Sequence, residues 1–208
     1  MVIGLHGIKT GGNLCSECMI KVVHQLQVIH VYSSTNHSSR STDQMSVQLV
    51  VCSPRHFLSN WTVVKSPESV FIDFRERLMD QGIEIPDSHD IMEYYSADLY
   101  AGAELDMIDV CYEESKTLAD VLQGSVFFSI PGRTTLSFEY KSPGSNQDAL
   151  CFDVRSVEGL LEALGVVEES LRGDEPGQAR DKIAYCIDCY REAAKVTSQV
   201  GHPVFVSF

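Results

Sequence analysis

The hydrophobic positions of this chain change their spacing several times, which predicts helices and strands in alternation. Apolar residues three or four apart predict amphipathic helices at residues 13–25, 66–81, 87–100, 116–122, 156–171 and 176–200. Alternating or β-branched stretches predict strands at residues 1–9, 28–32, 45–52, 61–64, 105–112, 125–130, 134–141, 149–154 and 204–208. The sequence therefore predicts an α+β fold with a mainly antiparallel sheet, packed by several amphipathic helices.

The helix predicted at residues 66–81 has well-marked boundaries. Ser66 is a cap residue, Pro67 suits the first helical position, and Glu68 places an acid in the first turn. Gly82 is predicted to end the helix. The inward positions are predicted to be Val70, Phe71, Phe74 and Leu78.

Turn residues divide the later part of the chain into short strands. Pro131-Gly132 and Ser142–Ser145 separate the three strands predicted between residues 125 and 154, which favours a three-stranded meander. A strand at residues 204–208 is expected to be tied into the sheet, so truncation there should destabilise the protein. Because no Pro/Gly/Ser-rich linker or repeat divides the chain, residues 1–208 are predicted to form a single domain.

The composition is that of a globular protein and disfavours membrane insertion. Hydrophobic residues make up 44% of the 208 residues and charged residues 22%. No apolar run approaches the roughly 18 residues of a membrane span, and the first residues lack the basic region of a secretory signal. Seven cysteines without a dense disulfide pattern favour a reducing compartment. We therefore expect a cytoplasmic protein that does not bind membranes.

The acidic residues are concentrated in one part of the chain, Glu68–Asp120. This segment holds fifteen Asp or Glu residues against Arg75, Arg77 and Lys116, whereas the whole chain has a net charge of −13 and a pI near 4.8. Binding to DNA or RNA depends on basic residues that displace counterions, so direct nucleic-acid binding is disfavoured. Aromatic side chains lie between the acids, and this combination suits docking on a basic protein.

The acidic segment therefore predicts a protein-interaction module without chemistry of its own. Such a module would bind and inhibit a basic partner protein, as inhibitors, immunity proteins and nucleic-acid mimics do. An ordinary acidic surface that only solvates the protein explains the same composition equally well. The predicted contact residues are Asp87, Asp90, Glu93, Tyr94, Tyr95, Asp98, Tyr100, Glu104, Asp106, Asp109, Glu113 and Glu114.

Two C-x-x-C pairs lie near opposite ends of the chain. Cys15 and Cys18 with Cys186 and Cys189 would supply the four thiolates of a structural zinc site. The 167 residues between the pairs are far from the spacing of a zinc ribbon. Buried reduced thiols or a redox pair account for the same residues, so three alternatives stay open.

An enzyme is the second hypothesis for function. Cys15 near a helix start and His202 before an apolar strand are candidates for the nucleophile and base of a thiol hydrolase. His89 with neighbouring acids is a candidate for a metal-dependent hydrolase, although the same acids would serve as a helix cap. The sequence contains no G-x-S-x-G, H-E-x-x-H or P-loop motif. A third hypothesis is a zinc-stapled structural subunit.

Overall fold

The computed structural model describes residues 46–60, 67–88, 92–130, 135–141, 149–172 and 177–207. These residues all belong to one compact unit, residues 41–208. The elements predicted at residues 1–9, 13–25, 28–32 and 61–64 lie outside the described residues. The assignment of the whole chain to a single domain therefore stays a prediction.

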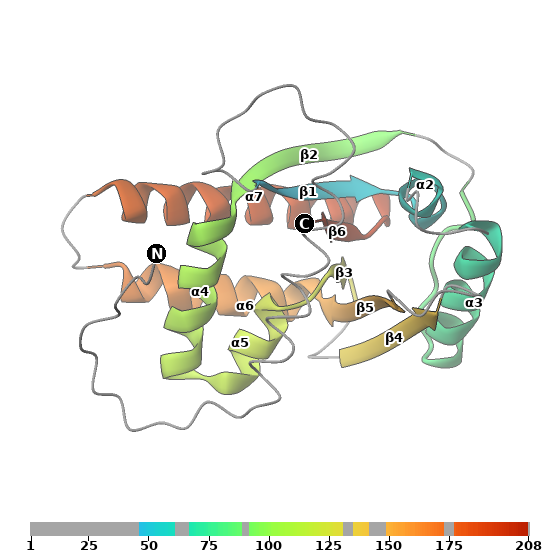
Figure 1. Cartoon of the computed structure of the whole chain (residues 1–208), viewed down its shortest axis with the longest axis horizontal. Coiled ribbons are helices and arrows are strands. Elements are labelled where there is room, and N and C mark those ends of the chain that lie inside the picture. The colour runs from blue at the N-terminus through green and yellow to red at the C-terminus, as the bar shows by residue number, and fades with distance from the viewer. Residues whose placement is uncertain are drawn as a thin grey trace, which may run out of the picture. The chain divides into compact units, whose positions relative to one another are not determined.

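The centre of this unit is a six-stranded sheet with the strand order β2-β1-β6-β3-β5-β4 (Figure 1). Neighbouring strands are antiparallel except β3 and β5, which are parallel. The strands are β1 (Ser46–Cys52), β2 (Glu93–Tyr100), β3 (Val126–Phe128), β4 (Thr135–Lys141), β5 (Ala149–Ser156) and β6 (Val204–Ser207). The expectation of a mixed fold with a mainly antiparallel sheet is confirmed.

Helices cover both faces of this sheet, and β1 shows why. Val47, Leu49 and Val51 join a core with helices α4 to α7, whereas Val50 and Cys52 join a second core with α2 and α3. Successive side chains of a strand point to opposite faces, so the two cores lie on opposite sides of the sheet. The helices are α2 (Pro54–Asn60), α3 (Pro67–Asp80), α4 (Ala101–Glu114), α5 (Lys116–Leu122), α6 (Val157–Ser170) and α7 (Gln178–Val200).

Three of the predicted helices form close to their predicted bounds, although Ser66 and Pro176, the predicted starts of α3 and α7, lie outside the described residues. In α3, Phe71, Phe74 and Leu78 are buried as predicted. The Oγ of Ser156 accepts a hydrogen bond from the Gly159 N–H at 2.9 Å and caps α6. Gly82 and Gly201 follow the last residues of α3 and α7, each with φ near 74°, a left-handed conformation that glycine adopts without strain.

The predictions for residues 87–100 and 105–112 are wrong, because strand and helix are exchanged there. Residues 93–100 form strand β2 and residues 101–114 form helix α4. A bulge in the β1–β2 pairing, between Val51 and Cys52, leaves two consecutive tyrosines half-buried and hides the alternation of the strand. In α4 the buried Ala103, Met107 and Cys111 lie four residues apart, which is helical spacing.

The meander predicted between residues 125 and 154 also requires a correction. Strands β4 and β5 form an antiparallel hairpin, but β5 lies between β3 and β4 and pairs with β3 in parallel. The three strands run in the same alternating directions as in a meander, so the turn residues alone do not distinguish the two arrangements. The side chains of β3 are all buried, and the strand has neighbours on both edges, β5 and β6.

Candidate protein-interaction surface

The acidic segment Glu68–Asp120 does not form one surface. The first part of this segment contains helix α3, which packs on the core that also contains Phe205. The second part contains helix α4, which packs on the core at the opposite face of the sheet. The six-stranded sheet therefore lies between the acids of α3 and those of α4.

Arginines neutralise several acids around α3. Arg55 contacts Glu68 at 2.8 Å and Asp87 at 3.2 Å, and Arg75 approaches the second oxygen of Asp87 at 3.0 Å. Arg77 pairs with Asp73 at 2.9 Å. Asp87, one of the predicted partner contacts, is thus already held between two guanidinium groups, while Asp90 and His89 lie outside the described residues.

The acids on α4 have a different environment. Residues 92–115 contain seven Asp or Glu residues and no Lys or Arg. Within the described part of the chain, no ion pair joins the exposed acids of α4 to a basic side chain. These acids are Asp106, Asp109, Glu113 and Glu114, all of them predicted contacts.

Apolar side chains accompany three of these acids on the solvent side of α4. Leu105 and Tyr112 are 46% and 39% exposed, and their spacing of seven residues places both on one side of the helix. Asp106, Asp109 and Glu113 follow the adjacent stripe at spacings of three and four. We call these five residues the α4 outer face. The predicted contact residues included neither Leu105 nor Tyr112, because residues 105–112 were expected to form a strand.

Glu104 does not belong to this face. Its side chain is buried between α4 and α7, where the hydroxyl of Tyr190 donates a hydrogen bond to its carboxyl group. Burial raises the pKa of Glu104 from 4.5 to about 7, and the Tyr190 hydrogen bond opposes this change. A buried carboxyl group cannot contact a partner protein, so Glu104 lies outside any docking surface of this structure.

The predicted residues of β2 have separate environments. Tyr94 is half-buried and stacks on His202 with ring centroids 5.2 Å apart. Glu93 lies 3.9 Å from His56. Asp98 is exposed and pairs in register with Gln48, on the sheet face opposite that of Leu99 and α4.

Two further tyrosines of β2 adjoin α7. Half-buried Tyr95 contacts Cys189, and burial raises the pKa of its phenol. Tyr100, which is 38% exposed, meets exposed Tyr185 edge to face at 5.6 Å. Strand β2 therefore places the exposed ring of Tyr100 beside the start of α4, but it does not extend the row of acids formed by Asp106, Asp109 and Glu113.

The cysteine hypotheses are tested only in part. Cys186 and Cys189 are buried on the inner face of α7, and burial raises the pKa of Cys186 to about 11. This placement fits the buried-thiol alternative. Among the residues that the structure describes, no three His, Cys, Asp or Glu side chains are grouped to hold a metal ion. Cys15 and Cys18 lie outside the described residues, so the zinc site stays a prediction.

The hydrolase hypothesis gains no support from His202. This residue is 4% exposed and lies beneath Tyr94, so its ring does not face an accessible substrate site. Its suggested partner Cys15 lies outside the described residues.

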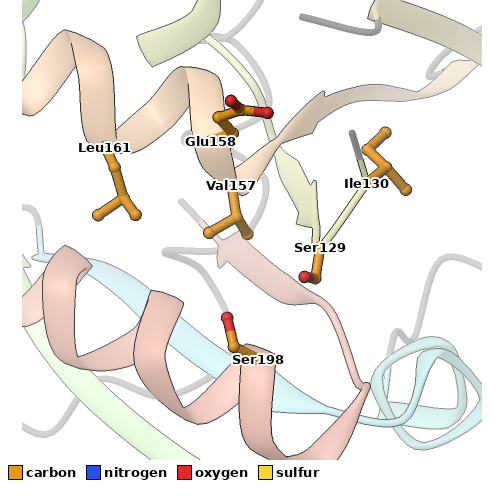
Figure 2. Close-up of a pocket in the computed structure, with 6 residues that line it drawn as sticks. All are labelled: Ser129, Ile130, Val157, Glu158, Leu161 and Ser198. Carbon is orange, nitrogen blue, oxygen red and sulfur yellow. The ribbon is translucent and has the colours of Figure 1, made fainter. Parts of the chain in front are cut away.

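A shallow groove of about 360 Å³ opens elsewhere on the unit. Figure 2 shows Val157 and Leu161 of α6 on one side, Ser198 of α7 on another, and Ile130 beyond the end of β3. Its volume is within the usual range of small-molecule sites, but Leu161 is 42% exposed, so the groove is open to solvent. None of the predicted contact residues lines it.

Comparison of the chain with protein-family models, with curated proteins and with solved structures gives no match. Among the described helices, even the 23-residue α7 lacks an apolar stretch long enough to cross a bilayer. Function must therefore be inferred from the chemistry of the residues described above.

Proposed function

We propose that this protein is an interaction module that binds a basic partner protein through the α4 outer face and inhibits it by covering its basic surface. The observation that supports the proposal is the contrast between the two acidic groups. Arginines compensate Glu68, Asp73 and Asp87, whereas Asp106, Asp109 and Glu113 stand uncompensated beside exposed Leu105 and Tyr112.

Each part of this face has a physical role in binding. Uncompensated carboxylates attract a basic partner at long range and raise the association rate. The leucine and tyrosine side chains supply apolar contact area, which is where interfaces gain most of their affinity. The acids also oppose their own helix, because Asp109 and Glu113 are like charges at i and i+4. A basic partner would relieve that repulsion.

A matched pair of charge variants tests the proposal. The first variant carries Asp106→Asn, Asp109→Asn and Glu113→Gln on α4. The control carries Glu76→Gln, Asp80→Asn and Glu84→Gln, which removes three exposed acids from α3 and the loop after it. Both lose three negative charges, so a difference between them reports the position of the charge and not its amount.

The native chain and both variants serve as baits for proteins from the native host at low salt, and captured proteins are purified for titration. We expect the native chain to capture a basic protein. Its affinity for the native chain should fall at least tenfold between about 20 and about 150 mM salt, because screening weakens exposed charge contacts. The α4 variant should lose a further tenfold or more, and the α3 control should bind as the native chain does. Inhibition is then read from the activity of the purified partner. Equal binding by the two variants would contradict the proposal.

A further inference from the structure

The buried contact between Glu104 and Tyr190 joins α4 to α7. Both side chains are almost fully enclosed, with 5% and 1% of their surfaces exposed. Tyr190 donates its hydroxyl hydrogen to the carboxyl group, and the two residues are 86 positions apart in the sequence. Within the described part of the chain, no ion pair supplies a cation to Glu104, although the N-terminal turn of α4 favours a negative charge weakly.

The other ionisable groups near this contact do not compensate a charge on Glu104. From α7, Tyr190 and Cys186 face the carboxyl group, and Cys189 lies one turn along the same buried face. At the junction of β2 and α4, Tyr100 hydrogen-bonds to Cys186 through its backbone. The ammonium group of Lys182 lies over the Tyr100 ring, 5.3 Å from its centroid.

Helices α5 and α6 contribute apolar side chains to the same core, among them Leu122 and Leu160. On α4 itself, Cys111 donates to the carbonyl oxygen of Ala163. The remaining ionisable residues of α5 and α6 are exposed or paired: Lys116, Asp120, Glu158, Glu162 and Glu169 are exposed, and Glu168 pairs with Arg191.

We propose that Glu104 and Tyr190 form a proton-controlled latch that holds α4 against α7. With the carboxyl group protonated, the contact is a hydrogen bond between neutral groups in an apolar core. When the carboxyl group loses its proton to solvent, one negative charge remains in that core with a single hydroxyl donor. Separation of α4 from α7 would expose the carboxylate to water, so the separation becomes easier once the group is charged.

The direction of the pH dependence follows from the environment of the carboxyl group. Its pKa is about 7 when α4 is docked, against 4.5 in water, so the docked state binds the proton more tightly. Docking is therefore tightest in acid and weakens as the pH rises through 7, by at most about 300-fold in equilibrium constant. Because α4 carries the proposed binding face, partner binding should weaken over the same range; this consequence rests on the proposed function, whereas the latch does not.

Hydrogen exchange of the α4 amides tests the latch without any partner. Peptides that cover residues 101–114 are followed by mass spectrometry, with rates corrected for the pH dependence of intrinsic exchange. In the native chain we expect protection to fall about tenfold between about pH 6 and about pH 8.5. The variant Glu104→Gln, which cannot ionise, should show no such fall, and Glu76→Gln, which removes an exposed acid from α3, should behave as the native chain does.

The variant Tyr190→Phe provides a second readout. It removes the donor that stabilises the carboxylate, so the fall in protection should move to higher pH. Equal protection of native α4 at both pH values would overturn the latch, and so would a Gln variant with the native pH dependence. Should Glu104→Gln fail to fold, an unchanged midpoint in Tyr190→Phe would overturn it. None of these outcomes excludes partner binding, so the two proposals fail separately.

Discussion

Glu113 and Glu114 occupy the last turn of α4, where a helix carries partial negative charge and no basic side chain compensates it. This is the wrong end of a helix for acids. We predict that Glu113→Lys stabilises the folded protein by about 0.3–1 kcal/mol, because it improves the helix-dipole interaction and removes the repulsion from Asp109. Urea denaturation at low salt measures the change in the free energy of unfolding.

A substitution at the opposite end of another helix provides the control for Glu113→Lys. Asp181 lies in the first turn of α7, where an acid is favourable, so Asp181→Lys should destabilise the protein. The same Glu113→Lys variant should bind a basic partner less tightly than the native chain. A variant that is more stable and binds less would show that this acid is placed for binding at the expense of stability, whereas a loss of stability would contradict the prediction.

The position of Glu104 shows which part of the candidate site the sequence cannot predict. Helical spacing does set Glu104 apart, because it lies three residues before Met107 and seven before Cys111 and so shares their buried side of α4, but residues 105–112 were expected to form a strand. What the sequence does not show is its partner Tyr190, which approaches from a helix 86 residues away. Asp106 and Asp109 are exposed, as acidic residues normally are, and their contact with a partner stays a prediction.

Strand β6 lies between β1 and β3, so a segment close to the end of the chain completes the middle of the sheet. Its Phe205 is 1% exposed and stacks on Phe57, with ring centroids 4.0 Å apart. We predict that Phe205→Ala costs about 3–5 kcal/mol, because it leaves a cavity between the sheet and α2. Removal of residues 203–208 should abolish cooperative unfolding altogether, since β1 and β3 would lose their common neighbour. Circular dichroism during thermal and urea denaturation measures both effects.

Ser207, which is only half-buried on the same strand, provides the control for Phe205. The variant Ser207→Ala keeps the backbone hydrogen bonds of β6 and should change the stability by less than about 0.5 kcal/mol. A truncated chain that still unfolded cooperatively would show that β6 is not required to hold the sheet together.

The elements of this fold were predictable where one local pattern was sufficient. Residues 66–82 carry a predicted cap residue, an apolar stripe and a terminal glycine, and α3 forms at Pro67–Asp80. Residues 87–112 lack such agreement, because the β-bulge disturbs the alternation of β2 and the acids of α4 are compatible with either structure. The lateral order of β3, β5 and β4 depends on pairings between distant strands, which turn residues do not encode.

The charge distribution of the described unit is uneven, although the overall composition is ordinary. Arginines lie around α3 and form ion pairs with acids there, whereas residues 92–115 contain seven acidic residues and no Lys or Arg. With a net charge of −13, the protein pays for this arrangement through self-repulsion in the compact state. The sequence established the total charge, but only the fold shows which acids are compensated.

Salt should therefore have opposite effects on folding and on binding. Screening reduces the repulsion among the acids, so we predict that the melting temperature rises by about 2–4 °C between about 10 and about 150 mM NaCl, equivalent to roughly 1 kcal/mol. Over the same range, affinity for a basic partner should fall. Differential scanning calorimetry at constant pH measures the first effect, and titration with the partner measures the second.

In the variant with Asp106→Asn, Asp109→Asn and Glu113→Gln, the rise in melting temperature with salt should be smaller, because fewer like charges remain to be screened. A melting temperature that fell with salt would mean that favourable ion pairs, such as those of Arg55 and Arg75 with Asp87, outweigh the repulsion on α4.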